Sequence, residues 1–259
     1  MLNFNLVVAA LTADRYDLTC RTIEALFVHN PWLHDHPLYY ADDKSTDDRI
    51  RPYMAKAGFK PVILNNSERR IGCSPISDGM LRIIKGIEKE QDNTLVLYLQ
   101  NDEVCTRPIS HDLINDFFAQ PNNVCLMLDR RKWLWKRARR RQWASQDIAG
   151  EKVVMARWSA WPIQISRLEW LCKMCNNATM ERTLMKRGRR QKCITGICGH
   201  NPIFIHAAEW KNGKTRKRRQ IWKNTIRTPD GIFASIRAWP YHKDNEQIVK
   251  YYNDEKEEA

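Results

Sequence analysis

The sequence of 259 residues contains no apolar run of 18 residues, no glycine-rich phosphate loop and no internal repeat. The first absence argues against a membrane-spanning helix. Neither G-x-G-x-x-G nor the Walker pattern occurs, which argues against a dinucleotide site or a P-loop. The short apolar stretch near the N-terminus has no basic leader and is followed by Asp14, Arg15 and Asp17, so we predict a first strand and no signal peptide. A cytoplasmic location is expected (the host cytoplasm for a viral protein), with the eight cysteines mostly reduced.

Acidic residues are also absent from three basic windows, which carry the positive excess of the chain. Arg130–Trp143 holds eight lysines and arginines, Lys186–Lys192 holds five and Lys211–Lys223 holds seven. Together they hold 20 of the 43 basic residues, so the remaining 23 are outnumbered by the 30 acids, and the net charge of +13 is local. Such a concentration is expected where particular surfaces meet a polyanion.

Strands alternate with helices through the first 130 residues, which predicts βαβ units and a mostly parallel sheet flanked by helices. A chain of this length can bury a sizeable core as one domain. In the longest expected helix, we predict that Met80, Ile83, Ile84 and Ile87 point inward. The expected strands are Asn3–Leu11, Pro37–Ala41, Lys60–Leu64, Thr94–Leu99 and Val124–Leu128, and the expected helices are Asp14–Asn30, Ile50–Ala57, Ser77–Glu90 and His111–Phe118.

The second half of the chain is less regular. Val153–Ile165 predicts one or two strands with Pro162 at an edge or bend. Arg167–Met174 and Thr179–Arg187 are expected to be helices, and Pro202–His206 is expected to be a strand that ends at His206.

The apolar run Thr94–Leu99 predicts a strand buried on both faces, and it ends abruptly in Gln100, Asn101, Asp102 and Glu103. Ligands of open α/β sheets bind just outside the carboxyl ends of the strands. Asp102 is therefore a candidate ligand for a metal ion bound to phosphate. The alternative is that Asp102 caps a turn or the next helix.

A second acidic segment, Asp42-Asp43-Lys44-Ser45-Thr46-Asp47, follows the strand Pro37–Ala41. Carboxylates in this position can accept hydrogen bonds from the N3–H of a pyrimidine or from ribose hydroxyls. The alternative is a solvated acidic turn that caps the Ile50 helix, a role open to Ser45, Thr46 and Asp47.

Taken in order, the segments LVVAALTADRYDLTCRTIEAL, YYADDKSTDD and LVLYLQNDEV resemble the family 2 glycosyltransferases of GT-A fold, from about Leu6 to Pro108. The resemblance implies a GT-A-like, Rossmann-like α/β fold and transfer of a hexosyl or pentosyl group from a nucleotide sugar, expected to be a UDP-sugar. It implies that Asp42 or Asp43 contacts the uracil or ribose, and that Asp102 holds Mn²⁺ or Mg²⁺ against the diphosphate. Gln100 stands where the family usually has the first acid of this metal motif.

The resemblance extends loosely to two later residues. MERTLMKRG is similar to the family segment in which an acid opens a helix and deprotonates the acceptor, which makes Glu181 the candidate base. The alternative for Glu181 is a helix N-terminal acid favoured by the macrodipole. His206 matches the late histidine that binds the metal or the diphosphate, and its alternative is a structural histidine.

Four cysteines offer a rival metal site. Cys172, Cys175, Cys193 and Cys198 have a spacing that is compatible with structural Zn²⁺. However, Cys172 and Cys175 fall on an expected helix, where thiols three residues apart commonly face the core. Cys20, Cys73, Cys105 and Cys125 are expected to be small core residues.

Two of the basic windows interleave cations with tryptophans. Cations track phosphates and aromatic rings stack on unpaired bases, so the combination predicts nucleic-acid binding. We therefore expect a hydroxylated DNA base as acceptor, as in glycosyltransferases with which some bacteriophages modify their genomes. Two alternatives remain: a cell-surface glycan or lipid-linked acceptor at a membrane surface, and a non-catalytic nucleic-acid-binding protein. The candidate DNA-binding residues are Arg130, Arg131, Lys132, Trp133, Trp135, Arg139, Arg140, Arg141, Lys217, Arg218 and Arg219.

The charge pattern divides the chain near residue 210. Residues 1–210 are expected to form the GT-A-like domain, with a donor half to about residue 130 and an acceptor half from about residue 131. Residues 211–259 are expected to form a basic segment and a C-terminal extension.

Overall fold

The computed structural model describes residues 1–13, 16–64, 73–88, 93–101, 103–128, 144–156, 164–174, 193–198, 203–209, 225–227 and 232–235. The helices are α1 (Tyr16–His29), η1 (Pro31–Asp35), α2 (Ile50–Lys56), α3 (Cys73–Ile87), α4 (His111–Phe118) and α6 (Leu168–Met174). The strands of the main sheet are β1 (Asn5–Thr12), β2 (Leu38–Asp42), β3 (Lys60–Pro61), β4 (Thr94–Gln100), β6 (Asn123–Met127), β7 (Ser145–Ile148), β8 (Glu151–Ala156), β9 (Gln164–Arg167) and β10 (Ile194–Ile197).

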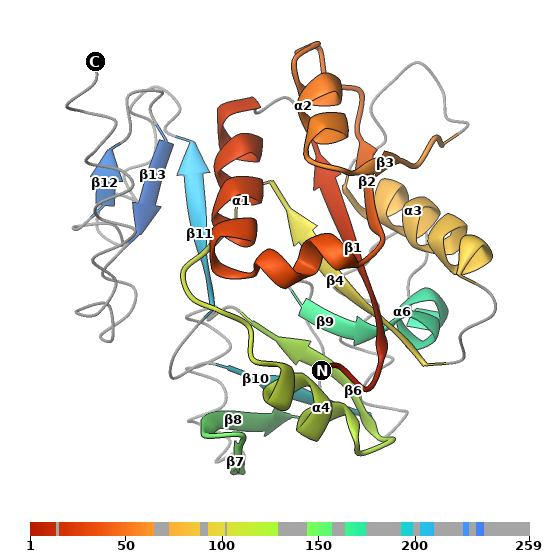
Figure 1. Ribbon diagram of the computed structural model, residues 1–259, viewed down its shortest axis with the longest axis vertical. Coiled ribbons are helices and arrows are strands. Elements are labelled where there is room, and N and C mark those ends of the chain that lie inside the picture. Colours follow the sequence, from red (N-terminus) through yellow and green to blue (C-terminus); the bar gives the residue numbers. More distant parts are fainter. Residues whose placement is uncertain are drawn as a thin grey trace.

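Within the described ranges, the main sheet has the order β3-β2-β1-β4-β9-β6-β10-β8-β7 (Figure 1). All of its strands except β8 and β9 run in one direction. The predicted mostly parallel α/β sheet is therefore confirmed. The exception at its centre is β9, which separates β4 from β6 and runs against both.

Helices cover both faces of this sheet, which explains the continuous apolar run of β4. Leu95, Leu97 and Leu99 face one core cluster, together with α1, α2 and α4, whereas Val96 and Tyr98 face a second cluster, together with α3 and α6. Residues 94 to 99 are all buried, as a strand covered on two sides requires. In the part of the chain described here, no helix combines the length and the apolar character needed to cross a bilayer.

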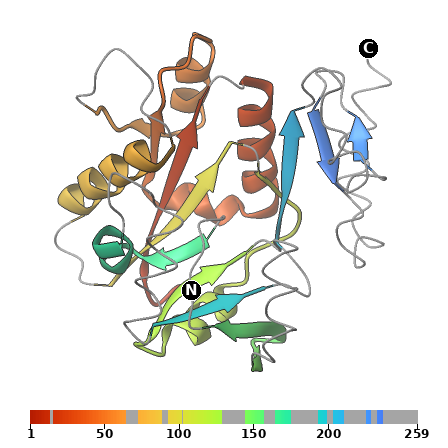
Figure 2. The same cartoon turned by 180° about the vertical axis from the view of Figure 1, so that it is seen from behind.

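A smaller sheet joins β5 (Glu103–Cys105), β11 (Phe204–Glu209), β12 (Thr225–Arg227) and β13 (Ile232–Ser235), in the order β12-β13-β11-β5. Figures 1 and 2 show β11 beside α1, on the side of the molecule away from α3 and α6. Because β5 starts three residues after β4 ends, this sheet begins at the carboxyl end of β4. The small sheet therefore adjoins the edge at which the sequence predicts a ligand.

Most of the predicted elements of the first half are confirmed, but several boundaries and faces were wrong. The third strand contains only Lys60 and Pro61, and α3 begins four residues before Ser77. Ile83 and Ile87 on α3 are 37% and 58% exposed, so they do not point inward as predicted.

The second half differs from the prediction in its strands. The strand expected to end at His206 continues to Glu209, and β5 and β7 were not predicted. Helix α6 confirms the prediction for 167–174 to within one residue. The expected helix Thr179–Arg187 lies outside the described residues.

Candidate functional site

The carboxyl ends of β1, β2 and β4 meet at one edge of the main sheet. The parallel pairing sets Thr12 opposite Asp42 and Leu11 opposite Gln100. Just beyond β2, the backbone N–H of Asp43 donates to the carbonyl of Thr12 at 2.9 Å. The two acidic segments found in the sequence are therefore brought to the same edge, where α/β folds bind ligands.

Asp42 is held by hydrogen bonds from two neighbouring segments. The Thr12 hydroxyl donates to Oδ1 at 2.8 Å, and the Ser45 backbone N–H donates to Oδ2 at 2.9 Å. The Ser45 hydroxyl also donates to Oδ1. Lys44 adopts a left-handed conformation (φ 55°), which turns the chain so that Ser45 returns to Asp42. A carboxylate has about four acceptor positions, so this arrangement fixes its orientation and leaves room for a further donor.

The sequence did not identify Thr12 as a partner of Asp42, although its position directly at the end of β1 is a usable signal. The sequence treated Asp42 and Asp43 as equivalent, and the structure separates them. The side chain of Asp43 is 6% exposed, whereas Asp42 is partly exposed. Asp42 is therefore the carboxylate with surface available to a ligand.

Asp47, at the end of the acidic segment, has the local role that the sequence left open for it. Its Oδ1 accepts from the backbone N–H of Arg49 at 3.1 Å, just before α2. The Arg49 guanidinium bonds both carboxylate oxygens, at 2.9 and 2.7 Å, and these hydrogen bonds lower the pKa of Asp47. The same guanidinium lies 4.2 Å from the centre of the Tyr16 ring at the start of α1. Asp47 and Arg49 thus tie α2 to α1 at the rim of the edge.

The tip of β4 is anchored to the first helix through Asn101. Its side-chain amide donates to the Thr19 hydroxyl at 3.3 Å and to the carbonyl of Ala13 at 3.5 Å. Asn101 therefore has a structural role between two carboxyl-edge segments. Asp102 itself lies outside the described residues, and Glu103 is fully buried as the first residue of β5.

His206 lies near this tip because β11 pairs with β5. The register sets His206 opposite Glu103, the residue that directly follows Asp102. The small sheet thus brings the backbones of the two predicted metal ligands close together, although they are more than 100 positions apart in the sequence. That closeness fits the donor set of one Mg²⁺ or Mn²⁺ ion.

The remaining predicted site residues are not described by the structure. Glu181 and Cys175 lie outside the described ranges. So do all of the candidate DNA-binding residues, namely Arg130, Arg131, Lys132, Trp133, Trp135, Arg139, Arg140, Arg141, Lys217, Arg218 and Arg219.

The cysteines proposed for zinc are not gathered at one point. Cys172 packs in the core cluster with α3, where its thiol donates to the carbonyl of Leu81 at 3.4 Å, and Cys198 packs in the cluster on the opposite face of the sheet. Burial raises the pKa of Cys172 to about 11 and that of Cys198 to about 12, which disfavours the thiolates that bind metal. Among the described residues, no three histidine, cysteine or acidic side chains form a metal-binding group. Cys105 and Cys125 are buried, as predicted, and Cys20 is half-buried.

No protein-family model and no curated protein matches the chain by sequence. Crystal structures of S. aureus TarS are similar in fold, with TM-scores of 0.52. One shares 12% identity over 77% of this chain and 36% of its own length. A second, residues 1–349 in complex with UDP-GlcNAc, shares 14% identity over 81% of this chain and 60% of its own length. The chain thus spans between about a third and three fifths of the structures it matches, and the similarity shows that it has their α/β fold.

Proposed function

We propose that the chain is a glycosyltransferase that takes its sugar from a UDP-sugar. The observation that carries this proposal is the oriented, partly exposed carboxylate of Asp42 at the carboxyl edge, beside the tip of β4. The TarS structures support it, because that glycosyltransferase was crystallised with UDP-GlcNAc and with UDP. A nucleoside bound at this edge would donate a ribose hydroxyl or the uracil N3–H to Asp42.

The other predicted residues have complementary roles in the proposal. Asp102 and His206 would hold Mg²⁺ or Mn²⁺, which neutralises the charge that develops on the diphosphate leaving group. The acceptor hydroxyl would form the new bond to the anomeric carbon as the bond to the diphosphate breaks, and Glu181 would take the hydroxyl proton. Gln100 supplies no charge, but Mg²⁺ bound to a diphosphate needs only one or two protein carboxylates.

Thermal unfolding with UDP-GlcNAc tests the donor site. A ligand at roughly 100 times its dissociation constant stabilises the folded state by about 2.7 kcal/mol, which raises Tm by roughly 5–10 °C for a chain of this size. Asp42→Asn should remove most of this rise, because the amide lacks the charge and the full acceptor capacity of the carboxylate. Asp48→Asn, an exposed acid in the same segment, should leave the rise unchanged.

Two outcomes would count against the proposal. If no nucleotide sugar changes Tm with or without Mn²⁺, the chain is better described as a binding module on a transferase fold. If Asp42→Asn retains the full rise, the nucleoside is held elsewhere on the edge.

For the acceptor, we extend the proposal to a hydroxylated base in DNA. The support is the sequence of the basic windows, in which Trp133 and Trp135 stand among eight cations of Arg130–Trp143. Binding to a duplex with hydroxymethylated bases, followed by fluorescence anisotropy, should weaken by roughly 10³-fold or more between 50 and 200 mM salt if about six phosphates are contacted. Absent binding at low salt, or a shallow salt dependence, would exclude DNA and favour a glycan or lipid-linked acceptor.

A further inference from the structure

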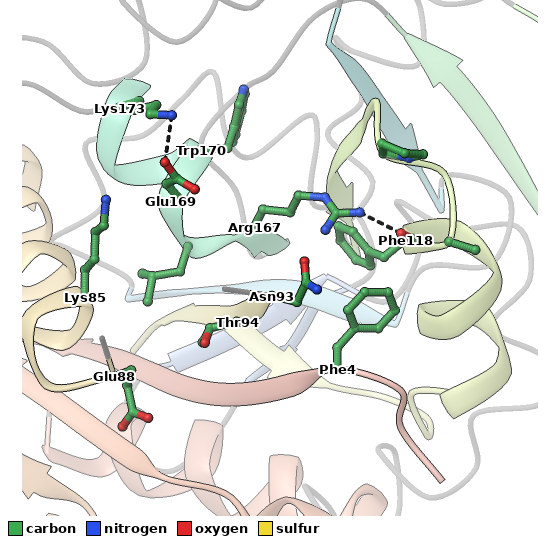
Figure 3. Close-up of a pocket in the computed structure, with 13 residues that line it drawn as sticks. Phe4, Lys85, Glu88, Asn93, Thr94, Phe118, Arg167, Glu169, Trp170 and Lys173 are labelled. Carbon is green, nitrogen blue, oxygen red and sulfur yellow. Dashed lines mark hydrogen bonds and ion pairs between the residues drawn. The ribbon is translucent and has the colours of Figure 1, made fainter. Parts of the chain in front are cut away.

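A second cavity, of about 730 Å³, lies at the opposite edge of the main sheet from Asp42. Its walls come from the amino ends of β1 and β4, the end of α3, the end of α4, and the start of α6 (Figure 3). The seven residues of β4 separate this cavity from the proposed donor site, a distance of roughly 20 Å at the usual rise of a strand. The cavity is therefore distinct from the proposed donor site.

Arg167 stands in the middle of this cavity wall. Its Nε donates to the carbonyl of Asn123 at 3.2 Å, and its Nη2 donates to the carbonyl of Phe118, the last residue of α4, at 2.6 Å. The guanidinium carbon lies 5.8 Å and 5.6 Å from the ring centres of Phe4 and Phe118. No carboxylate of the described residues pairs with Arg167, and burial lowers its pKa. These contacts fix the guanidinium and leave Nη1 without a hydrogen bond to any described residue.

Two more donors line the same space, as Figure 3 shows. Lys85, near the end of α3, is exposed, makes no hydrogen bond within the described part of the chain and acts on Glu169 only through charge. The indole Nε1 of Trp170 has no hydrogen-bond partner among the described residues, although this side chain is 7% exposed. A buried N–H without an acceptor costs free energy that a ligand oxygen can recover.

The carboxylates that line the cavity are already engaged. Glu169 pairs with Lys173 at 2.7 Å, and Glu88 accepts from the Tyr39 hydroxyl at 2.7 Å. The charged groups that remain open are therefore the cations Arg167 and Lys85. The cavity has a surplus of donors and positive charge, and it lacks the matching acceptor.

We propose that this cavity binds the phosphate or carboxylate group of a sugar-sized anionic molecule. A fixed guanidinium with an open nitrogen is suited to an oxyanion, and Lys85 adds a mobile second cation. The volume lies in the range of small-molecule sites. The site does not depend on the proposed transferase activity, because none of its residues lies at the carboxyl edge.

Isothermal titration calorimetry with glucose 6-phosphate, glucuronate and glucose tests this site. The phosphate or the carboxylate probe should bind, neutral glucose should not, and the comparison of the two anions identifies the preferred group. Lys85→Glu should weaken binding by roughly tenfold or more, because it places a like charge at an exposed position without disturbing the core. Lys152→Glu makes the same change at an exposed position of β8 and should bind as the wild type does.

The proposal is overturned if neither anion binds at millimolar concentration, if glucose binds as tightly as the anions, or if the two lysine variants lose affinity equally. Asp42→Asn separates this site from the donor site. It should keep its affinity for glucose 6-phosphate, and loss of that affinity would show that the probe binds at the carboxyl edge. Conversely, an anion site that persists in a chain without UDP-GlcNAc binding would leave this proposal standing and remove the proposed function.

Discussion

Replacing Asp102 with alanine is expected to abolish sugar transfer while the fold stays intact. Asp102 is the acid at the β4 tip, Gln100 carries no charge, and Glu103 is fully buried in β5. Without Asp102 the diphosphate leaving group loses its metal anchor, and removal of one such electrostatic contact costs roughly 10²-fold or more in rate. The measurement is UDP release from UDP-GlcNAc with Mn²⁺, together with Tm.

Asp116→Ala is the matched control for this variant, since Asp116 is an exposed acid on α4. It should retain full turnover and an unchanged Tm. Undiminished turnover in Asp102→Ala would show that the diphosphate is held by other groups. A large fall in Tm with little loss of turnover would instead assign Asp102 the capping role.

Gly196→Ala is expected to cause the largest loss of stability among single-methyl changes. A Cβ at this position of β10 would overlap the ring of Phe117 on α4 and come within 2.8 Å of Val153 Cγ1 on β8. Both neighbours are fully buried, so neither can move freely. Overpacking of this kind costs about 1–3 kcal/mol, and Tm should fall by roughly 2–4 °C for each kcal/mol.

Gly86→Ala provides the opposite case with the same chemical change. Gly86 lies in α3, and an added Cβ there would meet nothing within 4 Å. Alanine should therefore stabilise the helix by up to about 1 kcal/mol through its higher helix propensity. If the two alanine variants shifted Tm in the same direction, the close packing of Phe117 on β10 would not be the cause.

Helix α4 was predictable from local sequence because each of its signals agrees. The Ser110 hydroxyl accepts from the backbone N–H of Leu113 at 3.3 Å, which caps the first turn. Leu113, Ile114, Phe117 and Phe118 then fall on one buried face at helical spacing. The observed bounds, His111–Phe118, are those predicted.

In α3 the face was wrong because a polar residue stands inside the buried stripe. Ser77 is fully buried and shares a 2.7 Å hydrogen bond with the Tyr98 hydroxyl of β4. A stripe drawn through apolar residues alone omits Ser77 and turns toward Ile83 and Ile87. Its hydrogen bond depends on a strand 21 residues away, which local periodicity does not contain.

Strand pairing was the least predictable part of the fold. Ser145–Ile148 is mostly exposed and polar, so β7 has no apolar pattern. Its signal is the turn Ala149-Gly150, in which both residues have positive φ, as a two-residue hairpin requires. The position of β9 between β4 and β6 depends on contacts from distant segments and has no local signature.

The candidate site was predicted as a set of strand ends, and the structure adds how they are held. The patterns located Asp42 and Asp43 at the end of β2 because a short apolar strand gives way to acids there. They could not show that Thr12 orients Asp42, since that contact exists only once β1 and β2 pair. The catalytic roles of Asp102, Glu181 and His206 stay predictions.

The central position of β9 sets the order in which the sheet can be completed during synthesis. Strands β1 to β4 can pair with one another as soon as residue 100 has emerged, whereas β6 pairs with β9 and β10, which follow it in the chain. Until residues 164–167 arrive, the edge of β4 is open, and closure of that long loop comes late. A donor half cut near residue 130 would therefore carry an unpaired, apolar β6 and the exposed edge of β4, which are the features that promote aggregation.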